Sequence, residues 1–163
     1  MFLMKLLLHI SAWLQMIVYK LIYGKRLVVG SKTTWRKRMN IMIANEGKLH
    51  IGENCFFNND CSVSVLQRVS IGDRCLFGER VSIYDHNHCF KERKPIKSQG
   101  YSAGDVVIGD DCWIGSNVVI LKGVHIGNRV VIGAGCVIDT EIPDDTIVKR
   151  DNHLIFEKIR FKE

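Results

Sequence analysis

The sequence predicts an all-β chain that folds as a parallel β-helix, with a short N-terminal helix and one long extruded loop. Three regularities point there: large aliphatic residues with a six-residue period, glycine directly after many of them, and small apolar residues four positions on. The period runs without a slip through Ile108, Ile114, Ile120, Ile126, Ile132 and Ile138. Neither the 3.6-residue period of an α-helix nor simple strand alternation gives this register.

Each position of the six-residue block has a physical role in such a coil. The block forms one short strand and one corner, and three blocks close a coil around the large aliphatic side chains. Glycine is expected to relax the corner, where a side chain would clash or a positive φ is needed. It follows the aliphatic residue at Gly109, Gly115, Gly127 and Gly133. The crowded fifth position takes Cys112, Val118, Val124, Val130, Cys136 and Ile142.

Residues 1–26 are predicted to form an amphipathic helix that ends near Gly24. Its polar stripe consists of Lys5, His9, Ser11, Gln15 and Lys20. The stretch between Lys5 and Lys20 is too short and too polar to span a bilayer. No small-residue cleavage site is present, which argues against a secretory signal. Two interpretations remain. We favour a cap over the open coil or a subunit interface, because repeat folds must cover their terminal edge. The alternative is a helix that touches the membrane surface.

The β-helix is predicted over residues 27–148. Two further sets keep the register, namely Ile51, Phe57 and Val63, then Ile71, Phe77 and Ile83. The step from Val63 to Ile71 is eight residues, so two residues bulge there. At about residues 89–105 the repeat stops and charged residues become frequent, which predicts a loop that projects from a coil. Long structureless loops inside compact domains are usually functional. Residues 149–163 form a C-terminal tail.

Composition agrees with one repeat domain, because 47% of the 163 residues are hydrophobic and no linker divides them. The net charge of +6 favours anionic partners such as phosphates, nucleotides or acidic sugars. The basic residues are scattered and not interleaved with aromatics, which argues against nucleic acid.

The six cysteines are not predicted to form disulfides or a zinc site. Five of them, Cys55, Cys61, Cys75, Cys112 and Cys136, take the small interior position of a block, where cysteine behaves as a small hydrophobe. No C-x-x-C spacing occurs. Only Cys89 leaves the register, as an inert loop cysteine or a reactive thiol. Reduced cysteines favour a cytoplasmic location, and a membrane-touching helix would place the protein at the inner face of the membrane.

The segment "SIYDHNHCF" carries the candidate chemistry, where the regular coil gives way to the loop. It holds Asp85, His86 and His88 within four residues. Histidine exchanges a proton near neutral pH, and the mouth of an extended loop admits a substrate. The residues alone leave three interpretations open: a metal site, a general base oriented by a carboxylate or carbonyl, or solvated corner residues.

The blocks "IGDRCLFGERVSIYDHNH", "IGDDCWIGSNVVILKGVHIGNRVVIGAG" and "IPDD" resemble the hexapeptide-repeat acyltransferases over about residues 47–148. Within that family the chain is similar to maltose and galactoside O-acetyltransferases. It is closer still to O-acetyltransferases encoded with capsule and O-antigen sugar genes. The resemblance implies a left-handed β-helix, a homotrimer with clefts between subunits, and acetyl-CoA lying along the coils. It implies direct transfer to a carbohydrate acceptor, without an acyl-enzyme and without a metal.

The resemblance also assigns site residues. The family's base follows an apolar-aromatic pair, which makes His88 the base and His86 the second candidate. An asparagine thirty residues before the base matches Asn58, which would hydrogen-bond substrate or thioester. Asp85 would orient the imidazole, or else be a corner carboxylate in solvent. For acetyl-CoA, the resemblance implies Trp113 along the acyl and acceptor cleft, Ser116 and Ala134 along the pantetheine arm, with Lys122, Lys149 and Arg150 as candidates for the phosphates.

Departures from the family limit what the resemblance implies. The chain continues after "IP" with "DDTIVKRDNHLIFEKIRFKE" instead of the family's G-N-P-A stretch, and Leu66 stands at a sugar-recognising position of the galactoside branch. We therefore do not expect galactoside or maltose as substrate. The alternatives are N-acetylation of an amino sugar, a γ-carbonic-anhydrase-like metal protein, and a non-catalytic binding protein. His50, His125 and His153 supply no obvious third ligand beside His86 and His88.

Overall fold

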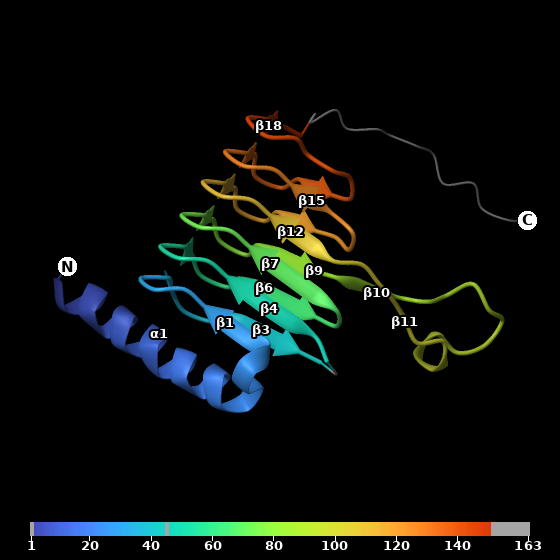
Figure 1. Ribbon diagram of the computed structural model, residues 1–163, viewed down its shortest axis with the longest axis horizontal. Helices are drawn as coiled ribbons and strands as arrows, with labels where there is room; N and C mark the ends of the chain where they lie inside the picture. The colour runs from blue at the N-terminus through green and yellow to red at the C-terminus, as the bar shows by residue number, and fades with distance from the viewer. Residues whose placement is uncertain (1, 45, 151–163) are drawn as a thin grey trace, which may run out of the picture.

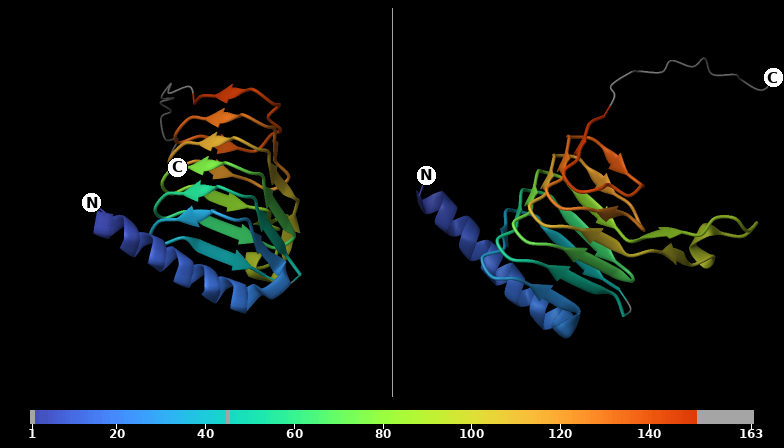
Figure 2. Two further views of the ribbon diagram at one scale, coloured as in Figure 1. Left: turned by 60° about the vertical axis from the view of Figure 1, so that its left-hand side comes forward. Right: turned by 45° about the horizontal axis from the view of Figure 1, so that its top comes forward.

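The computed structural model describes residues 2–44 and 46–150, with side chains from Ile10 onward. Stacked coils form a three-sided prism of parallel strands, with a helix across one end and a loop projecting from its side (Figures 1 and 2). Of the predicted C-terminal tail, residues 149–163, the part beyond Arg150 lies outside the described residues. Within the described residues, no helix has the length and apolar character needed to cross a membrane.

Three parallel sheets make the faces of the prism. The first face contains β1 (Leu27–Val29), β4 (Lys48–Ile51), β7 (Arg68–Ile71), β12 (Val106–Ile108) and β15 (His125–Ile126). The second contains β2 (Thr34–Trp35), β5 (Phe56–Phe57), β8 (Leu76–Phe77), β13 (Trp113–Ile114), β16 (Val131–Ile132) and β18 (Ile147–Val148). The third contains β3 (Asn40–Ile43), β6 (Ser62–Val65), β9 (Ser82–Tyr84), β14 (Val119–Ile120) and β17 (Val137–Ile138).

The six-residue period is the register of this stack. Ile108 pairs with Ile71 below it and Ile126 above it, and all three are buried. The coils begin one turn before the first repeat identified in the sequence. Trp35 of this additional coil pairs with Phe57, the large residue of the next block in the same column. Buried aliphatic side chains thus stack in columns along the axis, and each column removes apolar surface from water over its whole length.

The five cysteines predicted to lie inside the coils are buried and unpaired, as expected. The Sγ atoms of Cys61 and Cys112 donate to the carbonyls of Gly78 and Gly127, each at 3.1 Å. Burial raises the pKa of the Cys61 thiol to about 11, which keeps it protonated and unreactive.

The repeat glycines serve close approach between coils, and the positive-φ part of the expectation is wrong for them. A Cβ on Gly109 would stand 2.7 Å from the backbone of Gly127 in the next coil. The positive φ belongs instead to the residue two positions later in the block, as at Asp111 and Arg129. Glycine takes this position at Gly123 and Gly135, whereas elsewhere the side chain can bond along the stack. Arg129 Nε donates to Asp145 at 2.6 Å and holds the pKa of that carboxyl below its usual range.

Substitution of Gly115 by alanine is expected to destabilise the fold more than substitution of Gly133, which occupies the same corner one coil later. A Cβ at Gly115 would lie 2.7 Å from the Ala134 nitrogen, whereas at Gly133 the nearest atom is 3.2 Å away. Overpacking against backbone typically costs about 1–3 kcal/mol. Urea unfolding of the two variants measures the difference, and equal midpoints would contradict this account of the repeat glycines.

Helix α1 (Phe2–Tyr23) covers the open end of the first coil, which confirms the favoured interpretation of this segment as a cap. Gln15 Nε2 and the Tyr19 hydroxyl donate to the Met39 carbonyl at 2.8 and 2.9 Å. Trp35 Nε1 donates to Gln15 Oε1 at 2.8 Å. The predicted polar residue Gln15 therefore satisfies groups of the end coil that no further coil can pair. A 3₁₀ turn, η1 (Gly24–Arg26), joins the helix to β1.

Candidate active site at the root of the loop

The extruded loop begins and ends in a two-stranded antiparallel hairpin. Strand β10 (His86–His88) pairs with β11 (Tyr101–Ala103), and the 3₁₀ turn η2 (Ile96–Ser98) lies between them. The backbone N–H of Gly104 donates to the Asp85 carbonyl at 2.8 Å, which closes the loop where it leaves the coil. The hairpin holds the histidine segment away from the coil wall, and Figure 2 shows the loop standing out from the prism.

Asp85 is fully buried beneath this hairpin, so its interpretation as a solvated corner carboxylate is wrong. Its carboxylate accepts hydrogen bonds from the backbone nitrogens of Leu66 and Gln67 at 2.8 and 2.7 Å. These are the two residues by which the Val63 to Ile71 step exceeds the period. Buried charge persists only when it is well paired, and Asp85 thus fastens the irregular corner of one coil to the loop root of the next.

The Asp85 carboxylate orients His86 and not His88, which is the predicted base. Asp85 Oδ1 lies 2.8 Å from His86 Nδ1, and the His86 side chain is only 20% exposed. His88 is exposed, with its ring centroid 4.6 Å from that of Tyr101. Tyr101 also meets the edge of the His86 ring, at 5.4 Å between centroids. The sequence did not suggest Tyr101, because the hairpin that brings it beside the histidines has no alternating pattern.

His88 opens onto a cleft of about 490 Å³. The lining includes Cys89 and Gln99 from the loop and Lys122 from the coil that follows it. A cleft lined by a histidine and a lysine suits a reaction in which a base meets a partner that carries negative charge.

A cleft of similar size, about 510 Å³, lies near His125 on the first face. Its lining includes Glu141 and Asp144, and Glu141 lies 3.9 Å from the His125 ring nitrogen. This lining has two carboxylates and no Lys or Arg, whereas the His88 cleft has Lys91 and Lys122 against Glu92. The His88 cleft therefore suits an anionic ligand better, and we take it as the candidate site.

Four other predicted residues lie on or beside the corner between the second and third faces, away from the histidines. Asn58 follows β5 at this corner, and its Oδ1 accepts the Asn59 N–H at 2.9 Å. Ser116 and Ala134 lie at the same corner in later coils, one register position further along than Asn58. Ser116 Oγ accepts the Glu79 N–H at 3.1 Å. Trp113 points outward from β13 and is 57% exposed, as predicted. His88, in contrast, leaves the prism after the third face. One chain therefore does not bring these residues together with His88.

The three candidate phosphate-binding residues are also divided. Lys149 and Arg150 line a cleft of about 300 Å³ at the last coil, where Arg150 Nη1 donates to the Gly135 carbonyl at 3.4 Å. Lys122 lies apart from them in the His88 cleft. For metal binding, no group of three His, Cys, Asp or Glu side chains in residues 2–44 and 46–150 is arranged to hold an ion.

The chain is similar to acetyltransferases of known families. Residues 105–140 match the model for bacterial transferase hexapeptide repeats, and residues 68–83 match that for the hexapeptide repeat of succinyl-transferases. A putative lipopolysaccharide biosynthesis O-acetyl transferase, WbbJ of Escherichia coli, is 34% identical over 63% of this chain and 56% of its own length. Galactoside O-acetyltransferase of the same organism is 34% identical over 61% and 48%.

A solved structure supports the same relationship. The hexapeptide-repeat acetyltransferase VCA0836 of Vibrio cholerae, complexed with acetyl coenzyme A, superposes with a TM-score of 0.63 and 30% identity. That superposition covers 75% of this chain and 64% of the other. The chain spans about half the length of the curated relatives it matches.

Proposed function

Because the chain belongs to the hexapeptide-repeat acyltransferase family, we propose that it transfers the acetyl group of acetyl-CoA to a sugar hydroxyl. The acceptor would be a surface polysaccharide such as capsule or O-antigen, or its precursor. The similarity to WbbJ supports this acceptor class, since that relative is described as a putative O-acetyl transferase of lipopolysaccharide biosynthesis. The observation that carries the proposal is the exposed His88 in a cleft at the loop root whose lining also includes Lys122.

In the proposed mechanism His88 is the general base. Its ring accepts the proton of the acceptor hydroxyl as the oxygen attacks the thioester carbonyl. The tetrahedral intermediate then breaks its carbon–sulfur bond, and the CoA sulfur leaves with the proton that His88 returns. Backbone N–H groups near Ser116 would stabilise the oxyanion. His86 would keep Tyr101 and the hairpin in place, because its ring contacts both Asp85 and Tyr101.

The division of the site between two corners favours a homotrimer. A side-by-side arrangement of prisms would set the loop root of one chain against the second face of its neighbour. His88 and Lys122 of one subunit would then meet Asn58, Trp113 and Ser116 of the next, with Ala134, Lys149 and Arg150 continuing the acetyl-CoA path along the coils. Closed rings of three use such head-to-tail contacts, and acetyl-CoA would bind in each of the three clefts.

Acetyl-CoA titration by calorimetry tests this proposal before any acceptor is known. The wild-type protein is expected to bind acetyl-CoA with one site per chain. A free-thiol assay against a panel of nucleotide sugars and simple glycosides would then identify the acceptor class. Absence of acetyl-CoA binding by a folded sample would overturn the proposed activity.

A further inference from the structure

Helix α1 has a second apolar face that the coil does not use. Ala12, Met16 and Tyr19 pack on the first coil. On the opposite side, apolar residues recur at spacings of three and four and stay between 46% and 80% exposed. They are Ile10, Trp13, Leu14, Val18, Leu21 and Ile22. We call these six residues the outer stripe. A cap needs one apolar face, so capping does not account for the outer stripe.

The position of the helix turns the outer stripe away from the rest of the protein. Helix α1 lies across the end of the coil stack, at the opposite end from β18 (Figure 1). Its packed face meets the first coil, so the outer stripe points outward from that end. The loop projects from the side of the prism (Figure 2), and the His88 cleft is lined mostly by residues of this loop. A partner bound at the outer stripe would therefore leave the candidate active site open.

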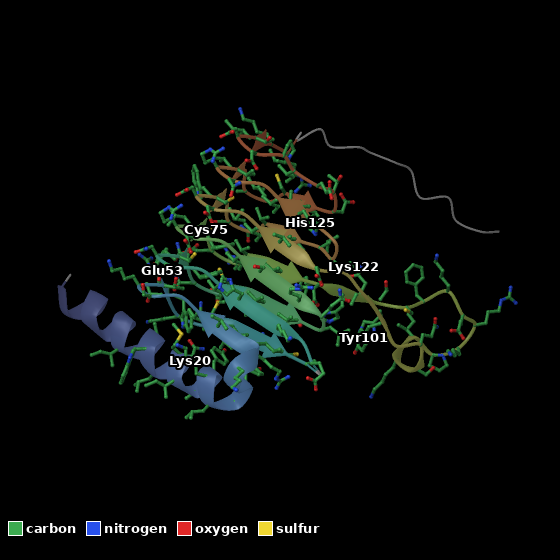
Figure 3. All side chains as sticks on the ribbon, in the orientation of Figure 1. Lys20, Glu53, Cys75, Tyr101, Lys122 and His125 are labelled. Atoms are coloured by element: carbon green, nitrogen blue, oxygen red, sulfur yellow. The ribbon has the colours of Figure 1, made fainter. Side chains whose placement is uncertain are left out.

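Charge is distributed very unevenly along the chain, and the positive charge lies at this end. Eight of the 23 Lys and Arg residues precede Glu46, which is the first acidic residue of the sequence. The remaining 15 stand against all 17 Asp and Glu residues, so the rest of the chain is slightly acidic. Lys20 on the helix, labelled in Figure 3, and Lys25, Lys32 and Lys37 around the first coil are all exposed.

We propose that the helix end of the prism docks on an anionic lipid bilayer, with the outer stripe inserted among the headgroups. An amphipathic helix that lies in the interface combines an apolar face with flanking Lys and Arg residues. Trp13 suits this depth, because its ring is apolar and its N–H can meet water or headgroups. Each basic residue near an anionic membrane surface strengthens attachment.

Charge also argues against a second copy of the chain as the occupant of the outer stripe. Two copies joined through their helix ends would bring two strongly basic, acid-free segments together, and like charges placed face to face repel. A bilayer with anionic headgroups is complementary to the same segment. In a trimer, three helix ends would meet one membrane together and strengthen attachment by multivalency.

Vesicle co-sedimentation tests the proposal with the full-length protein. The wild type is expected to pellet with vesicles of phosphatidylcholine and phosphatidylglycerol, and to remain in solution with phosphatidylcholine alone or at high salt. The double variant Leu14→Gln, Leu21→Gln should lower the bound-to-free ratio roughly tenfold or more, because it removes two inserted apolar side chains. Both positions are exposed, so the fold should be unaffected, which circular dichroism checks.

The matched control is the double variant Ile96→Gln, Val137→Gln. Its two apolar residues are 54% and 62% exposed but lie on the loop and on the third face. It should pellet like the wild type. The proposal is overturned if the wild type ignores anionic vesicles, if it binds neutral ones equally, or if both double variants behave alike. A change of mass in light scattering for the Leu14, Leu21 variant would also overturn it, by identifying a second copy as the partner.

Discussion

Replacement of His88 by alanine is expected to slow acetyl transfer by roughly 10²–10⁴-fold, because a positioned general base contributes about that much to a reaction barrier. Acetyl-CoA affinity should be retained, since His88 would act on the acceptor hydroxyl and not on the cofactor. Calorimetry and a free-thiol assay separate the two effects. His86→Ala is the comparison: it removes the ring that Asp85 holds but leaves the exposed base, so its loss should be smaller.

A mixing experiment extends this result to the two-chain site. His88→Ala and Asn58→Ala subunits should each be poorly active alone. Trimers reassembled from equal amounts of both should regain wild-type pairs at roughly a quarter of their sites, because each site takes His88 from one chain and Asn58 from its neighbour. No recovery in mixed trimers would place both residues in one subunit's site or remove Asn58 from it. A greater loss in His86→Ala than in His88→Ala would make His86 the base.

Replacement of Asp85 by alanine is expected to lower the free energy of unfolding by roughly 3 kcal/mol, because it removes a fully buried acceptor and leaves its partly buried donors without a partner. Those donors are the backbone nitrogens of Leu66 and Gln67 and the Nδ1 side of His86. Urea unfolding monitored by circular dichroism measures the change. The loop root should loosen as well, so proteolysis within residues 89–100 should become faster in the variant.

Asp105→Ala provides the matched control at the same loop root. Asp105 also bonds Gln67, through the side-chain amide at 2.6 Å, and pairs with Arg68 at 2.9 Å. That carboxylate remains partly in water, so its loss should cost less than about 1 kcal/mol. Equal destabilisation by the two substitutions would show that burial of Asp85 is not what makes it important.

The coil and its contents follow from the sequence alone. An aliphatic residue at every sixth position can point inward each time only if the chain turns at each block. The period therefore predicts the fold, the burial of the cysteines and the outward direction of Trp113. The interruption after Ile83 likewise predicts the loop, because residues without an apolar period cannot line the interior. The histidine pair was found because it lies where that period ends.

Other features depend on contacts between segments far apart in the chain, which no local pattern encodes. The partners of Asp85 are backbone groups about twenty residues away, so neither its burial nor its preference for His86 could be read from its neighbours. Tyr101 meets the histidines only through hairpin pairing. Asn58 follows a strand of the second face and His88 follows a strand of the third, so the two residues lie at different corners of the prism in one chain. Packing of one face of α1 on the coil decides which apolar residues of that helix remain exposed, because the end coil offers room for only one face.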